Sequence, residues 1–445
     1  MNDEMPPGWA WATFGDVSNV VGGATPKTKI AANWGDDVSW ITPDDLSHHS
    51  GMYIDRGRRS LTREGYESCS AQLMPAGSVL FTSRAPIGYV AISSGPVCTN
   101  QGFKSFVPQS GLRSEYLYWY LRFATPRIRA LGSGTTFKEI SKAVAASIWL
   151  PVPPNAEQKR IVAAIEEHFS RLDFAETALE VTRSKLQALR RSVLAAAFAG
   201  RLTNPPAAAD TDLGQLPAGW EQATIGEVSN VVGGATPKTT VAANWGDGIS
   251  WITPDDLSRH NGMYIERGRR SLTREGYESC SAQLMPAGSV LFSSRAPIGY
   301  VAISSGPVCT NQGFKSFVPQ TGLMSKYLYW YLRFATPDIQ AMGSGTTFKE
   351  ISKKVALSIP LILPPIDEQE QIVIAIEEFF SRLDAAEVAL EIVWSKLQAF
   401  RRAVLAEAFA GRLVPQDSDD EPAAALLARI AAERPVRPTS RKRSI

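Results

Sequence analysis

The chain has 445 residues, a hydrophobic content of 44%, a charged content of 20% and a formal net charge of +2. Its length exceeds the size at which one hydrophobic core stops growing, so two or more domains are expected, and its composition excludes an intrinsically disordered chain. No stretch reaches the roughly 18 apolar residues of a membrane-spanning helix, and the small net charge excludes a strongly basic nucleic-acid binder, so any basic surface must be local.

The first residues, MNDEMPPGWAW, are acidic where a secretory signal would be basic and then apolar. We therefore expect a cytoplasmic protein. Residues 1–154 predict a globular α+β domain, because short apolar runs such as VSWITP, SVLFTS and GYVAIS alternate with Gly, Pro and Ser. Among these runs, EYLYWYLRFAT predicts an aromatic helix. Asp44 and Asp45 follow a Thr-Pro turn, where an acidic pair caps a helix more often than it binds a metal ion.

A long helix is predicted over 155–202, directly after the proline cluster LPVPPNAEQ. Apolar residues recur there at spacings of three and four through four heptads, which is typical of a coiled coil. The seam residues expected on this helix are Ile161, Ile165, His168, Leu172, Ala175, Leu179, Thr182, Leu186, Leu189 and Val193. About 45 helical residues span about 68 Å at 1.5 Å per residue, and Gly200 stands where a C-cap is expected.

The same pattern then repeats 211 residues later. A Pro/Ala linker over 203–219 leads to a second globular domain over 220–365 and a second helix over 366–413, which ends at Gly411. A repeat of this length indicates a duplicated domain and helix rather than a solenoid array. The seam residues expected on the second helix are Ile372, Ile376, Phe379, Leu383, Ala386, Leu390, Val393, Leu397, Phe400 and Val404. The two helices can cover their apolar stripes by packing side by side, and an antiparallel pair is expected. Residues 414–445 predict one short helix and a flexible basic tail.

Signatures of catalysis are missing from the sequence. The four cysteines, two per repeat, form no CxxC motif or Cys/His cluster and are expected to be buried free thiols. Asn204-Pro205-Pro206 has the start of an amino-methyltransferase motif, but Ala207 stands where an aromatic residue should stack on a base. GSGTTFKE, at 132–139 and 343–350, lacks the spacing of a phosphate-binding loop. We expect no metal ion or cofactor on this chain.

The ordered set of motifs resembles one family closely. In both halves a PxGW start, GSGTTFK, PP-x-x-EQ at the beginning of the helix and FAGRL at its end follow one another from Trp9 to Leu413. This arrangement is similar to the DNA-specificity subunits of type I restriction-modification systems. The resemblance implies an α+β fold with two target-recognition domains, separated by two long antiparallel coiled-coil helices with pseudo-twofold symmetry.

The resemblance also implies a non-catalytic protein with double-stranded DNA as its ligand. Each globular domain would read one half of a bipartite site, and the helices would set the spacing and dock two methyltransferase subunits. AdoMet would bind to those subunits, and ATP and Mg²⁺ to a separate restriction and translocation subunit. No role at a membrane is expected.

The two globular halves are more alike than the two helices. Residues 9–154 and 220–365 differ at 23 of 146 positions, whereas 155–202 and 366–413 differ at 14 of 48. Ser83–Phe106 is repeated without a change as Ser294–Phe317. Two domains with the same side chains should read the same half-site, so antiparallel helices predict an interrupted palindrome as the target.

Residues with paired donors and acceptors are the candidates for DNA contact. In CTNQGFK, Asn and Gln match adenine, although both can instead hold the loop by bonding to its backbone. Arg84 could contact a base or a phosphate, or could instead form a buried ion pair. The lysines near glycines are candidates for contact with phosphate. The arginine run 56–59 is also assigned to phosphate, with a solvent-exposed surface as the alternative. The full candidate set is Thr25, Lys27, Arg56, Arg58, Arg59, Arg84, Thr99, Asn100, Gln101, Lys104 and Lys138, with Thr236, Lys238, Arg267, Arg269, Arg270, Arg295, Thr310, Asn311, Gln312, Lys315 and Lys349.

Two other classes of function remain open from the residues. A duplicated protein-interaction scaffold would use aromatic patches such as YLYWYL and would show no sequence-dependent binding to DNA. A stand-alone repressor would bind its operator tightly without a methyltransferase. Arg127 and Arg129 become Asp338 and Gln340 in the second half, so they are poor candidates for readout shared by both domains.

Overall fold

The structure is a computed structural model that describes residues 5–134, 138–203, 216–345 and 349–433. The expected linker motif at 204–206, the centres of both GSGTTFKE segments and the end of the basic tail lie outside these residues. The chain forms two compact units, 1–178 with 392–445 and 179–391, and each is described by itself. Among the described helices, none combines the length and apolar character needed to cross a bilayer.

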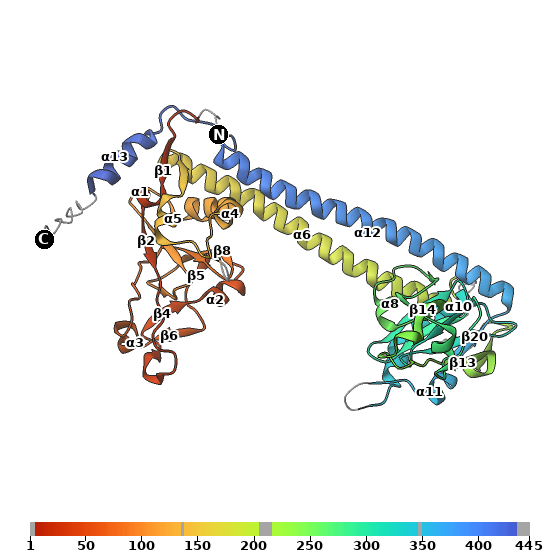
Figure 1. The fold of residues 1–445 in the computed structure, drawn as a ribbon. Coiled ribbons are helices and arrows are strands. Elements are labelled where there is room, and N and C mark those ends of the chain that lie inside the picture. The colour runs from red at the N-terminus through yellow and green to blue at the C-terminus, as the bar shows by residue number, and fades with distance from the viewer. Residues whose placement is uncertain (1–4, 135–137, 204–215, 346–348, 434–445) are drawn as a thin grey trace. The chain divides into compact units, whose positions relative to one another are not determined.

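The first unit holds an α+β domain and one end of each long helix, α6 and α12 (Figure 1). Its strands are β1 (Ala10–Thr13), β2 (Ser18–Gly22), β3 (Trp34–Gly35), β4 (Val38–Ile41), β5 (Tyr53–Ile54), β6 (Arg59–Leu61), β7 (Val79–Ser83), β8 (Ile87–Ser93), β9 (Cys98–Thr99), β10 (Lys104–Pro108) and β11 (Trp149–Val152). Its helices are α1 (Phe14–Val17), η1 (Ala31–Asn33), α2 (Pro43–Ser47), α3 (Arg63–Glu67), α4 (Ser114–Ala130), α5 (Lys142–Ser147) and α13 (Ala423–Glu433), with α6 (Asn155–Phe198) and α12 (Ile366–Phe409) each shared with the second unit.

Three sheets organise this domain. The central one has five strands in the order β2-β10-β7-β8-β5, in which β5 alone is parallel to its neighbour. A four-stranded sheet, β3-β6-β4-β9, forms a lobe that lies away from α6 in Figure 1, and β1 pairs with β11 near the start of α6. The short strands follow from the Gly- and Pro-rich sequence, which interrupts every apolar run.

The second unit repeats these elements. Its strands are β12 (Glu221–Thr224), β13 (Ser229–Gly233), β14 (Trp245–Ile252), β15 (Tyr264–Ile265), β16 (Arg270–Leu272), β17 (Val290–Ser294), β18 (Ile298–Ser304), β19 (Val308–Thr310), β20 (Lys315–Pro319) and β21 (Pro360–Leu363). Its helices are α7 (Ile225–Val228), η2 (Ala242–Asn244), α8 (Pro254–Ser258), α9 (Arg274–Glu278), α10 (Ser325–Ala341) and α11 (Lys353–Leu357). The central sheet again has five strands, in the order β13-β20-β17-β18-β15. The duplicated α+β fold predicted from the sequence is confirmed.

The aromatic helix of each domain is buried against the long helices of its own unit. On α4 the whole run Tyr116–Leu121 is buried, and the Tyr120 ring lies 5.1 Å from Phe409 of α12, edge to face. In the second unit, the Tyr331 ring has the same relation to Phe198 of α6, at 5.1 Å. The aromatic patch required by the scaffold alternative is therefore part of the core, where it gives about 0.5–1.5 kcal/mol per ring pair beyond the burial of area.

In each unit the two long helices run antiparallel. In the first, Arg401 of α12 contacts Asp173 and forms two 3.0 Å bonds to Glu176 of α6. In the second, Arg190 of α6 contacts Asp384 and lies 3.2 Å from Glu387 of α12. These partners are equivalent through the 211-residue repeat. The predicted seam is wrong at several positions. Leu189, Val393 and Phe400 are 47%, 42% and 48% exposed, and Phe379 is 40% exposed while its neighbour Phe380 is buried against Trp330.

Both helices end close to the glycines expected as C-caps, four residues before the predicted bounds at 202 and 413. Gly200 and Gly411 have φ values of +70° and +69°, and the amide of Arg201 donates to the Ala196 carbonyl over 2.9 Å. Glycine adopts this left-handed conformation without the steric cost that a Cβ carries. All four cysteines are free, and burial raises the pKa of Cys98 to about 12.

The one short helix expected within 414–445 is α13, but it packs against the first unit instead of belonging to a flexible tail. Ala423, Leu426 and Ile430 are buried in the core of the first unit, and the Ala423 amide donates to the Gly8 carbonyl over 2.8 Å. Leu426 fills the space beside Gly111, where a Cβ would collide with it. The helix packs because its apolar residues recur at spacings of three and four on one face.

Candidate nucleic-acid interface

Three loops of each domain meet around the CTNQG segment. In the first domain the Asn100 amide donates to the Ile41 carbonyl over 3.0 Å, and the Ala24 amide donates to the Thr99 carbonyl over 2.9 Å. Gly23 permits this approach, because a Cβ there would collide with the Asn100 carbonyl. The Thr25 hydroxyl donates to Gln101 Oε1, and Thr236 makes the same bond to Gln312. The structure thus brings together Thr25, Asn100 and Gln101.

The threonines of this loop are buried, and its asparagines bond to the backbone of the turn. Thr99 and Thr310 are each 1% exposed, so their hydroxyls are not accessible to a base, and this part of the prediction is wrong. Asn100 Oδ1 accepts the Gly102 amide over 2.8 Å, and Asn311 does the same for Gly313 over 2.9 Å. These asparagines hold the turn, as the alternative interpretation required, whereas Gln101 and Gln312 are exposed.

Lys104 is also committed within the domain. Its side chain is 13% exposed, and Nζ donates to Glu139 Oε1 over 3.0 Å and to Ser83 Oγ over 3.3 Å. Arg84 shares the same carboxylate, with Nη1 3.8 Å from Glu139 Oε2. Lys315, Arg295 and Glu350 repeat this triad in the second domain. Lys104 and Lys315 therefore hold the loop in place, while the Arg84 and Arg295 side chains remain 38% and 42% exposed.

The arginine run 56–59 divides into three different environments. Arg58 Nε donates to Asp45 Oδ1 over 3.1 Å and also pairs with Asp44, while Arg59 lies over the Trp34 ring at 3.4 Å. Arg56 is exposed and has no partner among the residues described. The second domain repeats this pattern at Arg269, Arg270 and Arg267. The run is thus less basic than its sequence indicates, because one of its charges is neutralised.

One member of the acidic pair, Asp45, is confirmed as part of a helix cap, whereas Asp44 pairs with Arg58. The Thr42 hydroxyl donates to Asp45 Oδ2 over 2.6 Å, and the Thr42 amide donates to the same oxygen over 2.8 Å. In the equivalent Asp256, burial raises the pKa, but the bonds from Thr253 and Arg269 outweigh burial and the net pKa lies below its ordinary value. Across the described ranges, no group of three or more His, Cys, Asp or Glu side chains is placed to hold a metal ion.

A small set of cations faces solvent beside these loops. Each is exposed and has no hydrogen bond or ion pair of its side chain within the described parts of the chain: Lys27, Arg56 and Lys138 in the first domain, and Lys238, Arg267 and Lys349 in the second. Such side chains can contact phosphate without first breaking an ion pair. They are the predicted residues that the structure leaves most available to DNA.

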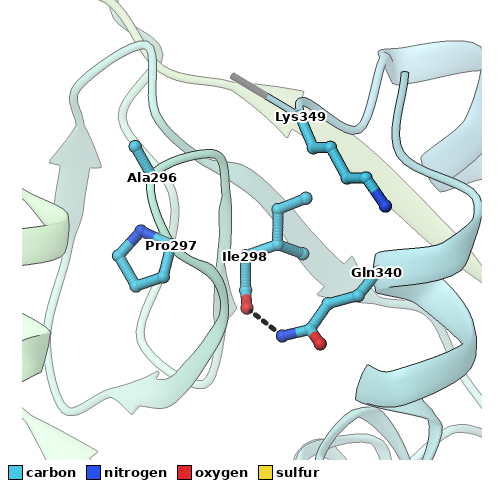
Figure 2. Close-up of a pocket in the computed structure, with 5 residues that line it drawn as sticks. All are labelled: Ala296, Pro297, Ile298, Gln340 and Lys349. Atoms are coloured by element: carbon cyan, nitrogen blue, oxygen red, sulfur yellow. Dashed lines mark hydrogen bonds between the residues drawn. The ribbon is translucent and has the colours of Figure 1, made fainter. Parts of the chain in front are cut away.

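A pocket of about 310 Å³ adjoins this region in the second domain and is lined by Ala296, Pro297, Ile298, Gln340 and Lys349 (Figure 2). Gln340 Nε2 donates to the Ile298 carbonyl over 2.8 Å, and the Lys349 side chain extends over the same side of the pocket. In the first domain, Arg129 Nε donates to the Ile87 carbonyl over 2.7 Å. Position 129/340 was not predicted as a site residue, because the two domains have different residues there. The difference between two nearly identical domains was the sequence signal that could have identified this position.

Comparison with known proteins follows the same division of the chain. The sequence profile of the family described as type I restriction modification DNA specificity domain matches residues 6–181 and 217–391. The MjaIX specificity subunit of Methanocaldococcus jannaschii is 40% identical over 164 residues, which are 36% of this chain and 38% of that protein. The EcoBI specificity subunit of Escherichia coli is 24% identical over 455 residues, covering 96% of this chain and 92% of that protein.

Solved structures share the fold over most of the chain. One, from a study of complex assembly and conformational transition of the type I R-M system, has a TM-score of 0.72 and 22% identity and covers 92% of this chain and 99% of its own. The HsdS subunit from Thermoanaerobacter tengcongensis has a TM-score of 0.58 and 23% identity and covers 93% of this chain and 100% of its own.

Proposed function

The chain belongs to the family of type I restriction-modification DNA specificity domains, and we propose that it is the non-catalytic DNA-recognition subunit of such a complex. Each globular domain binds one half of a bipartite site in double-stranded DNA. Catalysis resides in partner subunits, which bind AdoMet for methylation, and ATP and Mg²⁺ for restriction and translocation. This chain supplies sequence recognition to that assembly.

The observation that carries the proposal is the duplication of one interface in two domains. The Thr25–Gln101 contact, the Lys104–Glu139 pair and the three exposed cations all recur at positions 211 residues later. Identical donors and acceptors select identical bases. The proposed target is therefore a half-site, a fixed gap and the inverse complement of that half-site, which pseudo-twofold pairing of the antiparallel helices would place on opposite strands.

The long helices offer a surface for the methyltransferase subunits, of which we propose two. In the first unit, Phe174, Ile392 and Phe400 are 79%, 52% and 48% exposed, and in the second unit Ile374 and Val388 are 51% and 60% exposed. Large apolar side chains exposed along a helix are typical of a protein interface. The methyltransferases would also help to enclose the duplex, since the chain has a net charge of only +2. The isolated subunit is therefore expected to bind DNA weakly.

Mapping of methylated adenines tests the proposal directly. The genome of cells that express the partner subunits is compared with and without the gene for this chain, and a matched strain carries the chain with both Lys27→Ala and Lys238→Ala. Loss of one interrupted, inverted-repeat methylation motif on deletion is the expected result, with reduced methylation of the same motif in the variant. An unchanged set of methylated sites would remove the proposal.

A further inference from the structure

The few differences between the two domains gather partly at one place. Two of the 23 differing positions lie at the turn that joins β7 to β8: Thr82/Ser293 on the strand, and Arg129/Gln340, whose side chain reaches the turn from the end of α4 or α10. The turn itself is identical in both domains. The common scaffold is thus kept, while the side chains placed on it have changed.

Position 129/340 uses the same anchor in both domains but presents different chemistry. Arg129 donates Nε to the Ile87 carbonyl, and Gln340 donates Nε2 to the equivalent Ile298 carbonyl. A guanidinium has further N–H donors on Nη1 and Nη2, whereas the glutamine amide presents its remaining oxygen as an acceptor. Arg129 therefore offers a planar, charged pair of donors beside the turn, a geometry that matches phosphate oxygens.

The charge around position 129/340 is also more positive in the first domain than in the second. In the first domain, Arg127 and Arg129 occupy the last turn of α4, and Lys138 adds a third exposed cation. In the second domain, the last turn of α10 carries no basic residue, and Lys349 lines the pocket with the neutral Gln340. An anion therefore meets more positive charge in the first arrangement than in the second.

We propose that Arg129 and Lys138 bind one backbone phosphate of the DNA in the first domain, and that the Gln340 pocket of the second domain does not bind the equivalent phosphate. The inference rests on the proposed function, because it concerns how two domains of one specificity subunit grip two half-sites of the same sequence. Base recognition stays symmetric, while the first half-site gains a contact that depends on salt.

The test uses the full chain assembled with its methyltransferase partners and a duplex that carries the mapped site. The dissociation constant is measured over a series of KCl concentrations for the parent chain and for Arg129→Gln, Gln340→Arg and Gln222→Arg. One phosphate contact changes the slope of log K against log salt by about 0.9. Arg129→Gln should flatten the slope by about that amount, and Gln340→Arg should steepen it by about the same amount. Gln222→Arg, which adds the same charge at an exposed position of β12 outside the pocket, should leave the slope unchanged.

A second arm identifies the phosphate. Phosphates are replaced in turn by neutral methylphosphonate at the same position of both half-sites, so that neither orientation of the complex avoids the change, and one position should weaken binding by the parent chain but not by Arg129→Gln. Inorganic phosphate at matched ionic strength should not compete. Competition by inorganic phosphate without any position-specific methylphosphonate effect would show a site for free phosphate and overturn the inference.

The failure of the inference can be told apart from the failure of the proposed function. Unchanged slopes in both exchange variants, with retained preference of the complex for its mapped site over a scrambled duplex, would overturn only the phosphate assignment. Equal affinity of the parent complex for the mapped and scrambled duplexes would remove the proposed function, and the inference would fall with it. The gain expected from Gln340→Arg keeps the test valid even where Arg129→Gln unfolds.

Discussion

Trp9 donates its indole Nε1–H to the buried carboxylate of Glu157 over 3.0 Å, and Trp220 repeats this bond to Glu368 over 2.9 Å. The bond joins the first residues of each globular domain to the first turn of the long helix that follows it. Glu157 also accepts a bond from Gln416 Nε2 over 2.7 Å. The tryptophan in each PxGW start therefore fixes the domain onto its own helix, which is a role in positioning rather than in recognition.

Replacing Trp9 with phenylalanine should destabilise the first unit. The change removes one donor from a buried carboxylate and leaves a gap beside it, so we expect a loss of about 1–3 kcal/mol in the free energy of unfolding. Urea unfolding followed by circular dichroism measures the loss. The control Trp11→Phe alters a tryptophan that is 46% exposed and should change stability by less than about 0.5 kcal/mol. Equal effects of the two changes would contradict the positioning role.

The buried carboxylate of Glu157 should make stability depend on pH. Burial raises its pKa, and the bonds from Trp9 and Gln416 and the charge of Arg160 oppose this without cancelling it. Because the folded pKa lies above the unfolded value, the stabilising contribution is present in full below the ordinary pKa of glutamate. It is lost as the pH rises through the folded pKa.

Glu157→Gln should remove this part of the pH dependence. The difference between the melting temperatures of the parent and the variant, measured across the acidic range, is the direct readout. The parent is expected to lose stability relative to the variant as the pH rises. The control Glu64→Gln removes an exposed carboxylate of α3 and should keep the shape of the parent curve. A parent curve that runs parallel to that of Glu157→Gln would disprove the assignment.

Removing Arg401 should loosen the helix pair in the first unit. Its side chain is 17% exposed, makes two bonds to Glu176 and lies over the Phe169 ring at 4.9 Å. Because Arg401→Ala removes both of these bonds and leaves Glu176 with only the 2.7 Å bond from Gln398 Nε2, we expect a loss of about 1–3 kcal/mol. Arg183→Ala, which breaks an exposed pair with Glu391, is the control and should cost less than about 1 kcal/mol. Hydrogen exchange of the two helices would show the difference.

Gln101 and Gln312 should contribute equally to recognition of the two half-sites. In each, Oε1 accepts the neighbouring threonine hydroxyl, which orients the exposed amide. Gln101→Ala should reduce discrimination at one base pair by about 1–3 kcal/mol, and Gln312→Ala at the symmetric base pair by the same amount. Methylation rates on substituted sites measure both. If the two variants keep full discrimination, or affect unrelated base pairs, shared readout by these glutamines is wrong.

The organisation of the chain could be predicted because it depends on local signals. The prolines before Asn155, the three-four apolar spacing and the glycines at 200 and 411 define each long helix within a residue or two. The 211-residue repeat then gave the second copy. These features follow from backbone preferences, which short stretches of sequence carry by themselves.

The directions of side chains at the interface were harder to predict. Thr99 and Lys104 have the right chemistry for DNA, yet β9 turns Thr99 inward and Glu139, 35 residues away, captures Lys104. Phe379 fits the heptad pattern, but its neighbour Phe380 is the residue that packs against the Trp330 ring. In each case the deciding partner is distant in sequence, and spacing alone contains no information about it.

Helix α13 packs on the first domain and makes the two copies of the duplicated domain different. Leu426 fills the space beside Gly111, whereas no atom of the described residues occupies the corresponding space beside the equivalent Gly322. Val17 of α1 is fully buried, whereas Val228 of α7 is only half-buried. Two domains that are almost the same in sequence thus differ in their outer surface, so a protein that binds there can distinguish the first domain from the second.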